Sequence, residues 1–84
     1  MTKLIHRYRE QGDHYRWIWF APEPGPVHTG PLSERPDWLQ AVVNAGKIGD
    51  HATVAMSNPP MYLLWFTTDA DFNFIAFLNK EPVP

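Results

Sequence analysis

Residues 3–21, KLIHRYREQGDHYRWIWFA, decide the fold. In residues 3–10 the side chains alternate with the two-residue period of a β-strand: Leu4, His6 and Tyr8 fall on one side, and Ile5, Arg7 and Arg9 fall on the other. The next four residues, Gln-Gly-Asp-His, indicate a turn, because glycine can adopt positive φ and aspartate can hydrogen-bond to its own backbone. Aromatic and β-branched residues then fill the rest of the stretch, as is typical of a second strand. Residues 3–21 therefore predict a β-hairpin.

The same hairpin interleaves arginines with large rings. Simple alternation places Tyr15, Trp17 and Trp19 on one face, and it places Arg16, Ile18 and Phe20 on the other. One face must belong to the core, and the other can present arginines beside aromatic rings. Such a surface suits a protein partner, because Trp, Tyr and Arg dominate interface hot spots. It also suits nucleic-acid bases, which stack on rings and guanidinium planes. The alternative is a core of rings with a solvated arginine rim.

Residues 22–32, PEPGPVHTGPL, predict a stiff crossover loop. Four prolines and two glycines in eleven residues disfavour both helix and sheet. A loop stiffened in this way loses less entropy when it binds a partner, although a plain crossover is the simpler interpretation. The residues that we expect to bind a partner lie in the hairpin and this loop: Arg7, Arg9, Arg16, Trp17, Trp19, Val27 and His28.

The stretch SERPDWLQAVVNAGK, residues 33–47, predicts the only helix. Ser33 is the expected N-cap and Pro36 suits the first turn. Four apolar side chains share one face at helical spacing: Trp38, Leu39, Val42 and Val43. Gly46 is expected to end the helix.

The remaining residues predict three further strands. HATVAM at 51–56 is a short strand, and SNPP at 57–60 is a turn that leaves open whether Asn58–Pro59 or Pro59–Pro60 is cis. MYLLWFT at 61–67 is apolar on both faces, which is typical of a central strand covered on both sides. TDAD turns the chain, FNFIAFLN alternates as a last strand, and residues 80–84 form a frayed tail.

These elements predict one small α+β domain over residues 1–84. The order is β-β-α-β-β-β, so an antiparallel or mixed sheet of four to five strands carries one helix on one face. A chain this short buries only somewhat more than half of the surface that its unfolded state exposes, and with no cysteine it forms no disulfide. Its four Trp, three Tyr and five Phe must therefore supply most of the core.

The charge of the chain is unevenly distributed. The formal net charge is -2, which disfavours a dedicated nucleic-acid binder. Residues 1–20 carry four cations against two acids, whereas residues 21–84 carry three cations against seven acids. No signal peptide is visible, and the longest apolar run, residues 61–66, is too short to span a bilayer. We expect a soluble cytoplasmic protein with no membrane contact.

The tripeptide Gly-Asp-His occurs at residues 12–14 and again at 49–51. A metal or acid–base site would require His14 and His51, with Asp13 and Asp50, to converge on one atom. Both copies precede apolar stretches, and neighbouring residues of a strand point to opposite faces. We therefore interpret both copies as turns that lead into strands.

The sequence contains no motif for other catalytic chemistries. The two serines fit a helix cap (Ser33) and a proline turn (Ser57), and no nucleophile elbow or glycine-rich phosphate loop is present. Asp69 and Asp71 fit turn chemistry better than acid–base catalysis. The sequence therefore predicts no catalytic residue, no metal ligand and no cofactor.

Exclusion and composition favour a small non-catalytic module that docks on a larger protein and inhibits or modulates it. Phage and plasmid accessory factors and immunity proteins are of this type. Two alternatives stay open. One is a single-stranded nucleic-acid or RNA binder that uses the same hairpin, and the other is a small enzyme that uses its histidines and aspartates. A homodimer through an exposed edge or unburied rings is also compatible with the sequence.

Overall fold

A computed structural model of the chain describes residues 3–48, 52–54 and 58–78. Its elements, in chain order, are β1 (Lys3–Gln11), β2 (His14–Ala21), β3 (His28–Pro31), the 3₁₀ helix η1 (Leu32–Glu34), α1 (Asp37–Ile48), β4 (Ala52–Val54), β5 (Met61–Asp69) and β6 (Phe74–Phe77). All strand pairs in the described residues are antiparallel.

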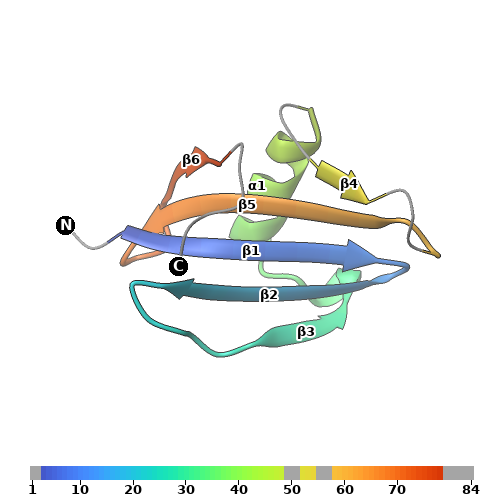
Figure 1. The fold of residues 1–84 in the computed structure, drawn as a ribbon, viewed down its shortest axis with the longest axis horizontal. Helices are drawn as coiled ribbons and strands as arrows, with labels where there is room; N and C mark the ends of the chain where they lie inside the picture. Colours follow the sequence, from blue (N-terminus) through green and yellow to red (C-terminus); the bar gives the residue numbers. More distant parts are fainter. Residues whose placement is uncertain (1–2, 49–51, 55–57, 79–84) are drawn as a thin grey trace.

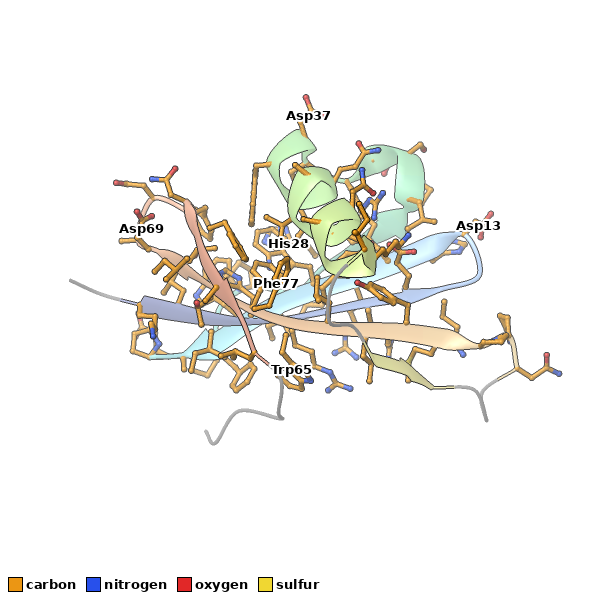
Figure 2. All side chains as sticks on the ribbon, turned by 90° about the horizontal axis from the view of Figure 1, so that it is seen from above. Asp13, His28, Asp37, Trp65, Asp69 and Phe77 are labelled. Atoms are coloured by element: carbon orange, nitrogen blue, oxygen red, sulfur yellow. The ribbon has the colours of Figure 1, made fainter. Side chains whose placement is uncertain are left out.

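The strands form one sheet in the order β3-β2-β1-β5-β4, and β6 also pairs with β5. β4 pairs with the start of β5 and β6 pairs with its end, so the two short strands share one edge (Figure 1). α1 lies across one face of this sheet, which we call the helix face (Figure 2). The opposite side is the open face. The predicted α+β class, with one helix on one face of the sheet, is confirmed.

The predicted hairpin is present as β1 and β2. Their register pairs Tyr8 with Trp17 and Gln11 with His14. Gly12 has a φ of +63°, so the first Gly-Asp-His is a turn that leads into a strand, as expected. The second copy, residues 49–51, lies outside the described residues.

The core lies between the sheet and α1. On the helix face the even-numbered side chains Leu4, His6 and Tyr8 of β1 are buried, as are Tyr15 and Trp17 of β2. The helix contributes three buried apolar side chains and β5 contributes two large ones: Leu39, Val42 and Val43, with Leu64 and Phe66. The buried side chains that recur at every second residue of the strands therefore pack against those that share one face of α1, and together they form one aromatic layer, as the sequence predicts.

His6 occupies the centre of this layer and is fully buried. Its Nδ1 accepts a hydrogen bond of 3.0 Å from Trp17 Nε1. Because an indole N–H can only donate, the imidazole proton must lie on Nε2, which is 2.8 Å from Thr68 Oγ1. The Thr68 hydroxyl in turn donates to the carbonyl of Asp69. Both ring nitrogens of His6 therefore have hydrogen-bond partners. The His6 ring also stacks on Phe66, with a centroid separation of 4.6 Å.

A second polar cluster connects the segment before α1 and the last turn of α1 to Glu10 of β1. Glu10 Oε2 accepts hydrogen bonds from Arg35 at 2.7 Å and from the Tyr8 hydroxyl at 2.9 Å, while Oε1 accepts one from Lys47 at 3.1 Å. The Arg35 side chain is only 8% exposed and that of Glu10 only 11%. Burial, with the neighbouring Glu10, raises the pKa of Tyr8. The ion pair between Arg35 and Glu10 is therefore largely shielded from water, and it holds the segment that leads into α1 against the sheet.

The N-terminus of the predicted helix is corrected by the structure. Ser33 lies in η1, so it does not cap α1, and the helix begins at Asp37. Gln40 donates its backbone N–H to the carbonyl of Pro36, so Pro36 immediately precedes the helix. Asp37 in the first turn and Lys47 in the last turn complement the helix dipole, as expected.

Gly46 does not end α1, which continues to Ile48. It is buried where the helix crosses the sheet, and a Cβ built there would lie 2.9 Å from Leu64 Cδ1 and 3.2 Å from a ring carbon of Phe77. Close packing of helix on sheet, rather than chain reversal, therefore accounts for glycine at this position.

The Pro/Gly-rich loop is also corrected in part. Residues 28–31 form strand β3 on β2, and Leu32 begins η1. β3 is an edge strand, so Pro31 can end it without leaving a gap in the sheet. The bonds Ala21–Pro22 and Asn58–Pro59 are cis. The expected tail, residues 80–84, lies outside the described residues.

We predict that His6 remains neutral in the folded protein far below its ordinary pKa. Burial lowers the pKa of His6 from 6.5 to about 4. Stability from the neutral ring is therefore fully present above pH 6.5 and is lost as the pH falls toward 4. In an NMR titration of the four histidines, the His6 imidazole should titrate near pH 4, and the free energy of unfolding should fall by on the order of 3 kcal/mol over that interval. A His6 that titrates near pH 6.5 would contradict the buried network.

We predict that Gly46→Val destabilises the fold through overpacking. The added methyl groups meet Leu64 and Phe77, so the free energy of unfolding should fall by about 2 kcal/mol. The matched control is Ala45→Val at the adjacent, exposed position of α1, which should cost less than about 1 kcal/mol. Urea unfolding of both variants measures the difference. Equal losses would show that Gly46 is not packed against β5.

Candidate functional site

The open face of the sheet carries the candidate site. Odd-numbered side chains of β1, and of β5 as far as Trp65, point away from α1 together with even-numbered side chains of β2, because neighbouring residues of a strand alternate between faces. Figure 2 shows Trp65 of β5 on this side, opposite the helix. Among residues 3–48, 52–54 and 58–78, no helix covers this face.

A hollow of about 300 Å³ lies on the open face. It is lined by three arginines and three apolar side chains: Arg7, Arg9, Arg16, Ile18, Phe20 and Trp65. The register explains the grouping, since Arg7 on β1 stands between Ile18 of β2 and Trp65 of β5. The hollow is therefore amphipathic, with an apolar floor and a cationic rim.

The ring of Trp65 is held in place from two sides. The Arg7 guanidinium lies over it at 5.5 Å from the ring centroid. Phe20 meets it edge to face, with centroids 5.4 Å apart. A cation over an indole is attracted by the ring quadrupole, so Arg7 is partly ordered before any partner arrives. The floor of the hollow is therefore preformed.

Arg9 and Arg16 stand directly opposite each other on β1 and β2. Like charges in a cross-strand pair destabilise a sheet. Within the part of the chain that the structure describes, none of the three arginines of the hollow forms an ion pair; the pairs found there are His14–Asp13, Arg35–Glu10 and Lys47–Glu10. Figure 2 shows Asp37 and Asp69 on the helix side of the sheet. Among residues 3–48 and 58–78, the hollow thus concentrates positive charge without a carboxylate in its lining.

A smaller, more polar depression of about 130 Å³ adjoins the hollow. It shares Arg9 and Arg16 with the hollow and is otherwise lined by Gln11, His14, Tyr15 and Thr29. His14 Nδ1 lies 2.8 Å from Asp13 Oδ1, and both side chains are largely exposed at the hairpin end. The two arginines therefore separate an apolar compartment from a polar one.

The structure does not bring the seven predicted binding residues to one surface. Arg7, Arg9 and Arg16 lie on the open face, as the alternation of the hairpin indicates. Trp17 is only 4% exposed and belongs to the core, and Trp19 packs against the same core. These two tryptophans therefore cannot share a surface with the arginines.

The two loop residues also lie apart from the arginines. His28 pairs with Trp17 in the sheet and stacks on its ring with a centroid separation of 4.5 Å, on the helix face. Val27 precedes β3 and is 48% exposed. Gly25 lies against the indole of Trp19, so the loop folds back onto the helix side of the sheet.

Trp65 was not among the binding residues predicted from the sequence, and neither were Ile18 and Phe20. Residues 61–67 were expected to be covered on both faces, but among their apolar side chains only Leu64 and Phe66 are buried, and Trp65 is only half-buried on the open face. One available signal was that apolar residues occupy the odd positions of β5 as far as Trp65, which lie on the same face of the sheet as Arg7 and Arg9 of β1. A sheet face that mixes large rings with unpaired cations indicates a contact surface.

The histidines of the described residues offer no assembled reaction centre. No three His, Asp or Glu side chains of residues 3–48 and 58–78 are grouped to hold a metal ion. His6 is fully used by Trp17 and Thr68 in the core. Asp13 and His14 form an exposed pair at a turn, and His51 lies outside the described residues.

Comparison of the chain with known protein families, with curated proteins and with solved structures finds no significant match. The fold and the open face therefore have to be interpreted from their own chemistry. None of the described helices is long and apolar enough to cross a membrane.

We predict that the cross-strand arginine pair lowers the stability of the free protein. Arg16→Thr removes the like charge opposite Arg9 and should raise the free energy of unfolding by about 0.5 kcal/mol at low ionic strength. Arg7→Thr is the control, because it removes the same charge but also the contact with Trp65, and it should lower stability by about 0.5 kcal/mol. Urea unfolding at low and high salt checks both variants. A loss of stability in Arg16→Thr would show that Arg16 has a stabilising partner.

Proposed function

We propose that this chain is a non-catalytic binding module that docks its open face on a larger protein and inhibits or modulates that protein. The observation that carries the proposal is the hollow on the open face, where three arginines without ion-pair partners in the described residues surround Trp65, Phe20 and Ile18. Trp and Arg are the residues that most often dominate binding energy at interfaces.

The size of the face is adequate for such an interface. Five strand positions at a spacing of about 4.8 Å, and strands of up to nine residues at about 3.3 Å per residue, give a face of roughly 20 by 30 Å. About 600 Å² per partner, or roughly 1,200 Å² in total, lies at the lower end of the range of about 1,200–2,000 Å² for specific interfaces. The face therefore suits a specific but modest contact, with a few anchors in the hollow supplying most of the affinity.

The preformed floor favours this function further. Strands β1, β2 and β5 hold the hollow on the centre of the sheet rather than on loops. Arg7 and Phe20 already restrain the ring of Trp65. Binding therefore costs less side-chain entropy than it would at a mobile surface.

Single-stranded nucleic acid is the competing occupant, since arginines beside aromatic rings also suit bases. Successive bases require ring faces that are open to stack on. The described open face has two large rings in the hollow, and they meet edge to face with Arg7 already over Trp65. A base would have to displace that guanidinium, so the geometry favours a protein partner.

We predict that the arginine pair is required for capture of the partner. Tagged wild-type protein should retain a stoichiometric protein partner from the lysate of its host after nuclease treatment, because the contact does not depend on nucleic acid. Arg9→Gln/Arg16→Gln should weaken that capture by about tenfold or more, since interfacial arginines contribute about 1–3 kcal/mol each. Binding of the purified partner, measured by calorimetry, gives the change in Kd.

The matched control is Gln40→Glu/Asn44→Glu, two exposed positions of α1 that change the net charge by the same amount on the other side of the molecule. It should bind as the wild type does. Equal weakening in both variants would show that net charge rather than the open face matters. A partner set that disappears with nuclease would contradict the proposal and favour nucleic acid, whose affinity also falls steeply with salt.

A further inference from the structure

We infer that the open face binds an acidic segment of the partner, in which an apolar side chain enters the hollow and a carboxylate two residues away pairs with Arg9 and Arg16. This inference rests on the proposed function and specifies the chemistry of the partner. It draws on three features of the described residues: the unpaired arginines, the two adjoining compartments and the covered ring of Trp65.

The charge of the hollow favours an anionic occupant. Arg9 and Arg16 oppose each other across β1 and β2, and Arg7 is the next residue on the same face of β1. The carboxylate nearest in sequence, Glu10, points to the helix face and is held by Arg35 and Lys47. A partner carboxylate between Arg9 and Arg16 would relieve their repulsion and accept charge-assisted hydrogen bonds, which are about twice as strong as neutral ones.

The spacing of the compartments matches an extended peptide. Arg9 and Arg16 form one row of the open face, and Arg7 with Ile18 forms the next row, two residues along the strands. Two residues of a strand span about 6.6 Å, which is also the separation of side chains i and i+2 on one face of an extended segment. An apolar side chain in the hollow therefore places a carboxylate two positions away beside Arg9 and Arg16.

The polar depression restricts the part of the bound segment that extends past the arginines. Beyond the arginine row stand Gln11 and His14, and Gln11 already donates its side-chain amide to the carbonyl of Pro59. Asp13 adds a negative charge at this end, beside His14. A phosphate backbone that continued past the arginines would meet that carboxylate, whereas a peptide can place a neutral residue there. This arrangement favours a short acidic segment over a polyanion.

Short peptides test the inference directly. The probe is acetyl-Glu-Ser-Phe-Ser-Glu-amide, which places phenylalanine two residues from each carboxylate. Its matched controls are the same peptide with both Glu replaced by Gln, the same peptide with Phe replaced by Ala, and hexathymidylate. Binding is followed by ¹⁵N NMR of the tryptophan indole signals, with Trp65 assigned from the variant Trp65→Phe, and of the arginine Nε signals.

The inference predicts a saturable shift of the Trp65 indole signal and of the Arg9 and Arg16 signals at millimolar peptide. The Gln and Ala peptides should bind about tenfold more weakly, because each loses about 1.4 kcal/mol of contact. Arg9→Gln/Arg16→Gln should weaken the Glu peptide to the level of the Gln peptide, while Gln40→Glu/Asn44→Glu should leave its affinity unchanged.

Four results would overturn the inference. One is a Gln peptide that binds as tightly as the Glu peptide, and another is hexathymidylate that binds more tightly than either. The third is the absence of any shift at Trp65, and the fourth is a dimer in sedimentation experiments that dissociates in Arg9→Gln/Arg16→Gln, which would make a second copy the occupant. If partner capture still depends on Arg9 and Arg16 when the peptide fails, the proposed function stands and only the acidic segment is wrong. If capture is also independent of them, the open face is not the interface.

Discussion

The buried imidazole of His6 is the interaction on which the arrangement of this sheet depends. It lies on β1, accepts a hydrogen bond from Trp17 of β2 and donates one to Thr68 of β5, so one ring fixes the register of three strands. A slip of one residue in β1 would expose His6 and drive Arg7 into the core, because side chains alternate between faces. The same hydrogen bonds that satisfy the core therefore place the arginines on the open face.

Charge is distributed unequally between the two faces of the sheet. Glu10 is used on the helix face, where Arg35 and Lys47 neutralise it and attach α1 to β1. The open face keeps three arginines and, in the described residues, no carboxylate to pair with them. Natural proteins often sacrifice some stability at functional sites, and an opposed arginine pair is such a cost. The carboxylate on the helix face is thus neutralised while the arginines of the open face lack partners in the described residues, which is the basis of the proposed docking function.

Much of the fold can be derived from local patterns, but tertiary packing decides the rest. The period of two in residues 3–21 and the positive φ of Gly12 suffice for the hairpin. Gly46 was predicted to end the helix, because glycine is favoured both at a helix terminus and at a close helix–sheet contact; the two cases are distinguished only by Leu64 and Phe77, which are distant in sequence. Strand β3 was missed because proline is compatible with an edge strand, and edge position is a property of the whole sheet.

The candidate site, too, could be predicted from local patterns only in part, because tertiary packing decides the rest. Alternation in the hairpin correctly grouped the arginines, but it did not indicate which face was buried, so Trp17 was included among the expected binding residues. The burial of that face depends on α1, and the floor of the hollow depends on Trp65 from β5. Hydroxyl-radical footprinting of the captured complex tests the central claim most directly. We expect Trp65, Phe20 and Ile18 to lose reactivity on binding while Phe74 and Ile75, which are exposed on β6, keep theirs. Protection confined to β6 or α1, with Trp65 unchanged, would contradict the assignment of the open face as the docking surface.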